Sequence, residues 1–423
     1  MITACIHDLI IPRIPPSIPA ASPQPIIPQE LIDIIIDYLY NDTRSLRACA
    51  LVASSWSGRS QQNLFLRIAL AGKPWPDKRK SRTSAELFLR LIESAPHIPS
   101  FVRHLEIIEG DAFRSYRWLA RSMPILHRIL PTLTNLRTFH INFTGLLWRD
   151  ILGIHESFLS ISKLPDLRKV TISSITSVPS LNGLFTLFEG SNVADICLVN
   201  VTTGALTDGS RTYVPTSVRI PLETLSLSLE SHEVWRLSSW FADPSCILRL
   251  SGLRKLRINI VEVQEMRAVS RLLETLHMPS LEAIEIRLES LDYADSTDHS
   301  ENLPNLSNFR HVRFALTPEC LLIEPEEWIS ASIAAQCWER LLKNFRENVI
   351  ETVTLMLPKI HPNRFPEAER MHWVALDAAL TRADMSHLRR VYLEDESSQG
   401  MDYRVAVIKD IFPNLYDKGL LVF

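Results

Sequence analysis

Glycine is scarce in this chain of 423 residues: it contains 12, or about 3%, against a usual content of ~7%. Phosphate-cradling loops and oxyanion turns depend on glycine, so this scarcity counts against nucleotide-dependent chemistry. The sequence also contains no Gly-x-Ser-x-Gly, Walker-type, Gly-x-Gly-x-x-Gly or His-Glu-x-x-His motif. We therefore expect a protein that is not an enzyme and needs no cofactor. An enzyme whose site is assembled from scattered residues is the alternative.

Paired cysteines and a strong charge of one sign are also lacking. The six cysteines are spread singly, so the sequence predicts no metal site and no redox motif, and it fits a reducing compartment, cytoplasmic or nuclear. The net charge of −3 gives no reason to expect nucleic acid or a membrane surface as partner. The sequence contains no run of 18 apolar residues free of charge, so we expect no membrane span. Residues 1–25 are interrupted by prolines and are expected to form a Pro-rich disordered tail, not a signal peptide.

Residues 26–70 carry the densest helical pattern. Pro28 suits a first helical turn, where a missing N–H costs nothing, and apolar residues then recur on nearly all sides of the predicted helix up to Leu39. After a turn at 41–43, Thr43 or Ser45 is expected to cap a second helix. A third short helix is expected to turn Leu64, Phe65 and Ile68 inward. Three small helices cannot bury this much apolar surface among themselves, so we expect a partner protein to cover the surplus.

This stretch resembles the F-box, in which Leu-Pro-x-Glu-(Leu/Ile) opens an Ile-rich helix and a Val/Cys helix leads to Trp. The leading Leu is Ile27 here. The resemblance implies docking on the Skp-type adaptor of a cullin–RING ubiquitin ligase. It also implies a set of adaptor-contact or core positions, namely Ile27, Pro28, Leu31, Ile35, Leu39, Leu46, Cys49, Val52 and Trp56. The alternative is that these are only core residues of an N-terminal helical cap.

From about residue 100 the chain repeats a pattern of apolar-x-x-apolar-x-apolar. Nine steps between the first positions of successive units give a period of about 32 residues. The ten units begin at Val102, Leu136, Leu167, Val193, Leu222, Leu253, Leu281, Phe309, Ile350 and Leu388. The apolar segment at 412–423 is expected to close the array with a strand.

Helix-like segments separate most units, for example Val234–Phe241, Val263–Leu276 and Glu367–Leu380. Alternating strands and helices predict a parallel sheet, and polar residues within each short strand predict that one sheet face is open to water. This pattern resembles leucine-rich repeats, although the Asn that usually ends their consensus is mostly missing. The fold class expected is therefore α/β: a three-helix F-box-like module (26–70), a linker and connecting helix (71–99), and an irregular leucine-rich-repeat solenoid (100–423) with a curved parallel sheet and outer helices.

The residues that flank the second apolar position of each unit should point away from the helices. In the C-terminal half they are rich in cations, and Arg and Tyr are favoured at interfaces. We expect the target-binding residues there, namely Lys255, Arg257, Glu285, His311, Arg313, Arg390 and Tyr392. Such a strip suits an acidic or phosphorylated peptide. The plainer interpretation is the solvated face of a half-buried sheet.

The resemblance thus predicts a substrate-recognition subunit of an SCF-type ubiquitin ligase, which binds the adaptor through its N-terminal module and an unknown target protein through its repeats. A repeat scaffold with no link to ubiquitination is the alternative, in which the helical module is only a cap.

Overall fold

A computed structural model describes most of the predicted elements. The described residues are 27–72, 83–109, 118–147, 155–176, 178, 181–203, 220–229, 231–243, 246, 248–260, 264–275, 280–288, 304–316, 335–342, 348–357, 367–395 and 408–422. The predicted Pro-rich tail and part of the predicted linker lie outside them. The chain divides into two compact units. The first comprises residues 1–193 and 203–210, and the second comprises 194–202 and 211–423.

Three helices open the first unit, as the sequence predicts. They are α1 (Gln29–Tyr38), α2 (Thr43–Val52) and α3 (Ser54–Phe65). Pro28 is the N-cap of α1, and its carbonyl accepts from the N–H groups of Leu31 and Ile32. The cap of α2 is Asp42 rather than Thr43 or Ser45, because its carboxylate accepts from the N–H groups of Arg44 (3.1 Å) and Ser45 (3.0 Å).

The third helix is shorter than predicted. It ends at Phe65, and Ile68 lies in a strand, β1 (Arg67–Ala71), which pairs in parallel with β2 (His104–Ile108). Ile68 stands opposite Leu105 and Leu70 stands opposite Ile107. The sheet therefore begins one strand earlier than the sequence pattern indicated, and β1 continues directly from the helical module.

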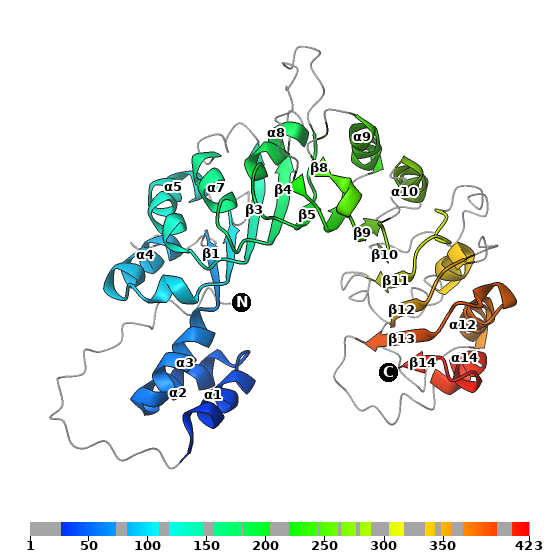
Figure 1. Cartoon of the computed structure of the whole chain (residues 1–423), viewed down its shortest axis with the longest axis horizontal. Helices are drawn as coiled ribbons and strands as arrows, with labels where there is room; N and C mark the ends of the chain where they lie inside the picture. Colours follow the sequence, from blue (N-terminus) through cyan, green and yellow to red (C-terminus); the bar gives the residue numbers. More distant parts are fainter. Residues whose placement is uncertain are drawn as a thin grey trace. The chain divides into compact units, whose positions relative to one another are not determined.

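The sheet of the first unit runs β1-β2-β3-β4, all parallel. Helices α4, α5 and α7 lie on one face of it (Figure 1). The further bounds are α4 (Ser84–Ser94), η1 (Ile98–Phe101), α5 (Trp118–Ile129), η2 (Leu130–Thr132), β3 (Thr138–Leu147), α7 (His155–Ser162), β4 (Lys169–Thr176), α8 (Leu181–Phe185) and η4 (Thr186–Phe188).

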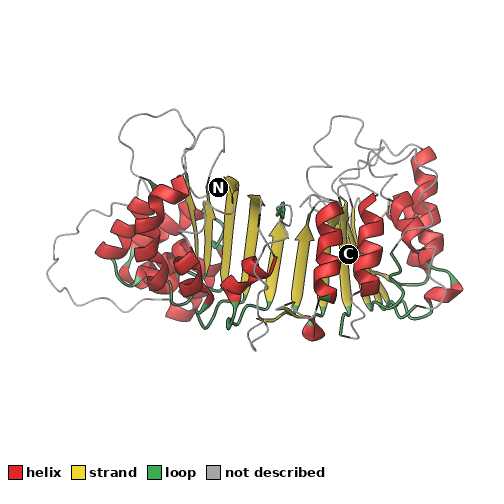
Figure 2. Cartoon of the chain, turned by 90° about the horizontal axis from the view of Figure 1, so that it is seen from above, coloured by secondary structure: helices red, strands yellow, loops and turns green. Residues whose placement is uncertain are grey.

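The second unit repeats the same arrangement in the order β5-β7-β9-β10-β11-β12-β13-β14. Its strands also run side by side in one direction (Figure 2), with α9, α10 and α12 on one face. Its elements are β5 (Asp195–Val199), β6 (Ile220–Pro221), β7 (Thr224–Ser228), α9 (Ser231–Ala242), β8 (Leu248–Arg249), η5 (Leu250–Gly252), β9 (Lys255–Ile260), α10 (Gln264–Thr275), β10 (Ala283–Leu288), β11 (His311–Leu316), β12 (Thr352–Leu357), α12 (Glu367–Leu380), η9 (Ala383–Met385), β13 (Arg390–Asp395), α14 (Pro413–Asp417) and β14 (Leu421–Val422). Residues 335–342 are also helical.

Every predicted repeat unit forms a parallel strand. The three apolar positions of each unit are buried, apart from the last one, Leu393, which is half-buried. The residues between them lie on the opposite, more accessible face. Lys255, Ala283 and His311 form one row across β9–β11, and Arg257, Glu285 and Arg313 form the next. The chain is thus an α/β array with a long parallel sheet and helices, and it resembles a leucine-rich-repeat solenoid.

The array ends on a short helix and strand. Strand β14 pairs in parallel with β13, which confirms the closing strand predicted near the C-terminus. Ahead of it, α14 is fixed by the buried carboxylate of Asp377 in α12. That carboxylate accepts from the backbone N–H groups of Asn414 and Leu415, each at 2.9 Å, and from Asn414 Nδ2 at 2.7 Å. A side chain of one helix therefore caps the next.

Candidate protein-interaction surfaces

The core of the three-helix module is small. Ile32, Ile36 and Leu46 form its buried centre. Leu39, Trp56 and Leu64 are only partly buried and pack against that centre. Ile32 and Ile36 are one helical turn apart, so a single stripe of α1 faces inward.

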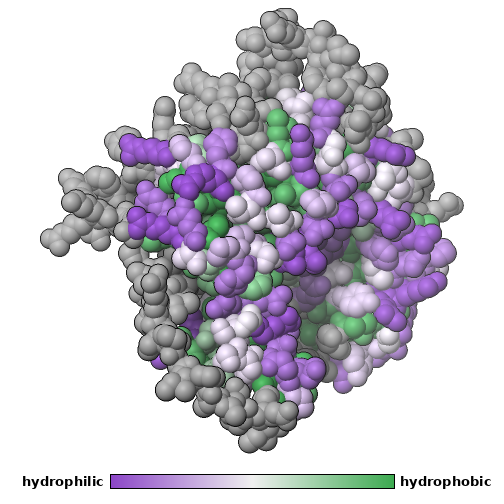
Figure 3. All heavy atoms as spheres, turned by 60° about the vertical axis from the view of Figure 1, so that its left-hand side comes forward, coloured by the Kyte–Doolittle hydropathy of each residue, from purple (hydrophilic) through white to green (hydrophobic). Residues whose placement is uncertain are grey.

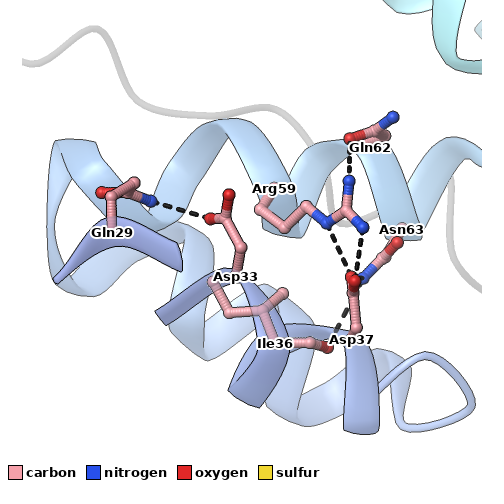
Figure 4. Close-up of polar contacts among 7 residues, drawn as sticks. All are labelled: Gln29, Asp33, Ile36, Asp37, Arg59, Gln62 and Asn63. Atoms are coloured by element: carbon pink, nitrogen blue, oxygen red, sulfur yellow. Dashed lines mark hydrogen bonds and ion pairs between the residues drawn. The ribbon is translucent and has the colours of Figure 1, made fainter. Parts of the chain in front are cut away.

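Polar contacts fix α1 against α3 (Figure 4). Arg59 donates from Nε to Asp37 (2.6 Å) and forms a second contact with the same carboxylate through Nη2. Asn63 Nδ2 donates to Asp37 at 2.9 Å, and Gln29 bridges Asp33 and the carbonyl of Ser55. The hydrogen bond from Arg59, supported by the one from Asn63, lowers the pKa of Asp37 despite some opposing desolvation. These contacts set the rotation of α1, and with it which isoleucines face solvent.

The outward side of α1 is an exposed apolar stripe formed by Leu31, Ile34, Ile35 and Tyr38. Leu31 is 51% exposed, Ile35 46% and Tyr38 84%. These residues recur at the spacing of one helix face, opposite the inward Ile32 and Ile36. Figure 3 shows apolar surface in separate patches between hydrophilic areas on the side of the molecule that it draws. Four large apolar side chains on one short helix are more than the scattered single exposures that need no explanation.

The predicted adaptor residues fall into three groups. Ile27, Pro28, Leu31, Ile35 and Val52 are exposed, Leu39 and Trp56 are half-buried, and Leu46 and Cys49 are buried. The last two are core residues and are not available for direct contact. Ile34, Tyr38 and Leu51 are exposed but were not among the predicted residues. Ile34 and Tyr38 could have been predicted from the sequence, because their spacing from Leu31 places them on the same face of the helix.

In the first unit, the polar sheet face is joined by hydrogen bonds between neighbouring strands. His140 on β3 contacts Glu106 on β2 (2.9 Å) through Nδ1 and Ser173 on β4 (2.9 Å) through Nε2. His104 contacts Thr138 in the same way, and burial together with the charges of Arg67 and Arg137 lowers the pKa of His104. These side chains use one another as partners, as in other sheets with polar cross-strand pairs.

In the second unit, four cations surround one carboxylate. The cation cluster consists of Lys255 and Arg257 on β9, Arg287 on β10 and Arg313 on β11. Their contacts with Glu285 are 3.4 Å, 2.9 Å, 2.7 Å and 3.8 Å respectively. Only the Arg287 contact has hydrogen-bond geometry, and the others are ion pairs. Arg313 also pairs with Glu394 on β13 at 2.7 Å.

Glu285, one of the predicted target-binding residues, is buried. It lies on the polar face as expected but is 1% exposed, because the longer cationic side chains around it exclude solvent. Desolvation alone raises the pKa of Glu285. The hydrogen bond from Arg287 and the charges of Arg287, Arg257 and Arg313 outweigh this effect, so the net pKa is lowered. Glu285 is therefore a buried counter-charge that orders the cations.

The remaining predicted target-binding residues lie on one face of β9–β13. Lys255, Arg257 and Arg313 are partly exposed in the cluster. His311 contacts Thr352 at 2.8 Å, and Arg390 donates to the hydroxyl of Tyr392 at 3.3 Å. Arg287 was missed because the repeat pattern ends at Ile286, one residue before it. The alternation of the strand, continued by two residues beyond Glu285, would have found it.

Among the described residues, no helix combines the length and apolar character needed to cross a membrane. Within the same part of the chain, no group of three His, Cys, Asp or Glu side chains is arranged to hold a metal ion.

No protein-family model matches the chain, and no curated protein matches it in sequence. Among solved structures, an internalin from Listeria monocytogenes is similar, with 11% sequence identity and a TM-score of 0.27. The match covers 86% of this chain and 92% of the internalin chain. At that TM-score the likeness adds nothing to what the strands and helices of the chain establish by themselves.

Proposed function

We propose that the chain is a substrate-recognition subunit of an SCF-type ubiquitin ligase, whose three-helix module docks on a Skp-type adaptor. The observation that carries the proposal is the apolar stripe of Leu31, Ile34, Ile35 and Tyr38 above a separate small core. The F-box resemblance of residues 27–56 supplies the identity of the partner. The mechanism is recruitment: the chain raises the effective concentration of a target at the ligase and performs no covalent step itself.

Apolar burial provides the energy for this docking. Fully burying one large apolar side chain contributes roughly 1.5–3 kcal/mol, so a stripe of three aliphatic residues and one tyrosine gives a sizeable interface core. The Asp37–Arg59 contact holds α1 in place before binding, which reduces the ordering cost on association. The polar face of β9–β13 then serves the target, in keeping with the solvated sheet face of a repeat array.

Co-expression with the Skp-type adaptor tests the proposal. Leu31→Asp combined with Ile35→Asp places two charges four residues apart in the stripe and should abolish co-purification, since it buries unpaired charges in the interface. The matched control is Arg90→Asp with Ser94→Asp, at the same spacing on exposed positions of α4. The control should co-purify like the unmodified chain. Adaptor binding that survives in the stripe variant would overturn the proposal.

The second candidate function is a protein-interaction scaffold with no ligase partner. The observation that favours it is the burial of Leu46 and Cys49, which fits a helical module acting as a cap. Absence of the adaptor from the unmodified chain after co-expression, with the chain folded and soluble, would select this function.

A further inference from the structure

The cation cluster has the properties of a preorganised anion-binding site. Its four side chains are 28–38% exposed, so each is partly held by its surroundings and partly accessible to solvent. Three guanidinium groups and one ammonium group carry far more N–H donors than the roughly four acceptor sites on the carboxylate of Glu285. The cluster therefore keeps donors for a further anion.

The charge balance indicates which anion fits. Lys255, Arg257, Arg287 and Arg313 carry four positive charges, while Glu285 and Glu394 carry two negative ones, so the net charge is +2. A phosphorylated side chain carries about −1.5 to −2 at pH 7 and offers three acceptor oxygens. A carboxylate carries −1, so a single acidic side chain neutralises only half of the excess.

The surroundings of the cluster favour a peptide over a nucleic acid. The adjoining β7 and β12 carry hydroxyl groups on the same face, at Thr224, Thr352 and Thr354, in register with the cationic rows. A duplex or single strand needs cations along an extended track to neutralise successive phosphates. Here the four cations of the cluster converge on a single carboxylate and do not follow an extended track, and the flanking hydroxyls suit hydrogen bonds to a peptide.

We propose that the cation cluster binds the phosphoryl group of a phosphorylated segment of a target protein, with Glu285 as the buried counter-charge that holds the four cations in place. This inference rests on the proposed function, because it supplies the chemical class of the target. Ala283 lies between Lys255 and His311 in its row and carries only a methyl group, so no long side chain of β10 separates the two at that position.

The test uses the full chain and three fluorescein-labelled degenerate nonapeptide mixtures that differ only in a central phosphoserine, glutamate or serine. Fluorescence anisotropy should give affinity for the phosphoserine mixture about tenfold or more above that for the glutamate mixture, as charge-assisted hydrogen bonds to a dianion predict. Equal affinity for the phosphoserine and glutamate mixtures would overturn the inference. So would tighter binding of a labelled oligouridine than of the phosphoserine mixture.

Lys255→Gln is the diagnostic variant, because it removes the charge, leaves Glu285 with three cationic partners and keeps a flexible polar side chain at the position. It should weaken phosphoserine binding about tenfold, as expected for one charge-assisted contact. The matched control is Arg254→Gln, which removes the same charge from an exposed neighbouring residue and should stay within about twofold. Equal losses in both variants would mean diffuse attraction only and would overturn the site. Arg287→Gln provides a second variant should Lys255→Gln not fold.

This experiment separates the two proposals because it contains no adaptor. Phosphoserine binding by a chain that fails to bind the adaptor would support the cation cluster and reject the ligase assignment. Adaptor binding without phosphoserine selectivity would do the reverse.

Discussion

At the scale of the residue, Glu285 decides the character of the polar face. A buried carboxylate is stable only when it is paired, and here four cations from three strands pair with it. Glu394 makes a matched comparison, because it pairs with the same Arg313 but is 45% exposed. The two carboxylates share a partner and differ in their exposure to water.

Glu285→Gln should lower the free energy of unfolding by roughly 1–3 kcal/mol at pH 7, because it leaves partly buried cations without their counter-charge. Glu394→Gln should cost below about 1 kcal/mol, as exposed ion pairs do. Urea titrations of both variants measure the difference. A cost for Glu394→Gln equal to that for Glu285→Gln would contradict the role given to burial.

The cost of Glu285→Gln also has a defined pH dependence. Because the pKa of Glu285 is lower in the folded chain than its ordinary value of 4.5, its ionised form contributes stability above about pH 4.5. That contribution disappears as the pH falls through the lowered folded-state pKa. The difference in the free energy of unfolding between the unmodified chain and Glu285→Gln should therefore be constant near neutral pH and should decrease as the pH falls below about 4.5.

At the scale of the element, the strands follow from local sequence more reliably than the helix boundaries. Strand β1 illustrates why one strand was missed. Phe65-x-x-Ile68-x-Leu70 carries the repeat pattern, but Leu64, Phe65 and Ile68 also have helical spacing. A short apolar run is compatible with either period, and pairing with β2 selects the strand. The pairing of β1 with β2, and not the helix propensity of the residues, therefore determines that α3 ends at Phe65.

The last helix depends on a contact from another element. Asp377→Ala should fray α14 and β14, because three hydrogen bonds to its carboxylate are lost, at a cost of about 2–4 kcal/mol. Hydrogen exchange at the amides of Asn414 and Leu415 measures the effect. Asp377→Asn keeps one acceptor oxygen and should be intermediate. Unchanged exchange in the alanine variant would show that α14 needs no such cap.

At the scale of the whole molecule, each unit is a series of similar parallel strands, and most of these strands pair with those of the neighbouring repeats. Stability in such arrays is close to a sum of local terms, so a core deletion is felt mainly nearby. Leu105 on β2 and Leu256 on β9 hold the same position of the repeat in different units, and both are buried. Substituting each of them therefore makes the same change at the same repeat position in a different unit.

Leu105→Ala and Leu256→Ala should each cost about 2–5 kcal/mol locally, through lost burial and a residual cavity. Hydrogen exchange followed by mass spectrometry should show faster exchange in the strands of the unit that carries each substitution. The unit that is not substituted serves as the internal control. A uniform increase over all strands in either variant would contradict local stability and indicate one cooperative fold.

Local sequence was enough to predict the ten repeat strands and the face on which their residues lie. A period of two in the strands and about 32 between them follows from local patterning, because buried positions must be apolar wherever the sheet stacks. Packing between separate elements determines which face of α1 is exposed, that Leu46 and Cys49 are core residues, and that Glu285 is buried beneath cations. Those outcomes depend on side chains from separate elements meeting in space, and no spacing within one segment encodes how closely they pack.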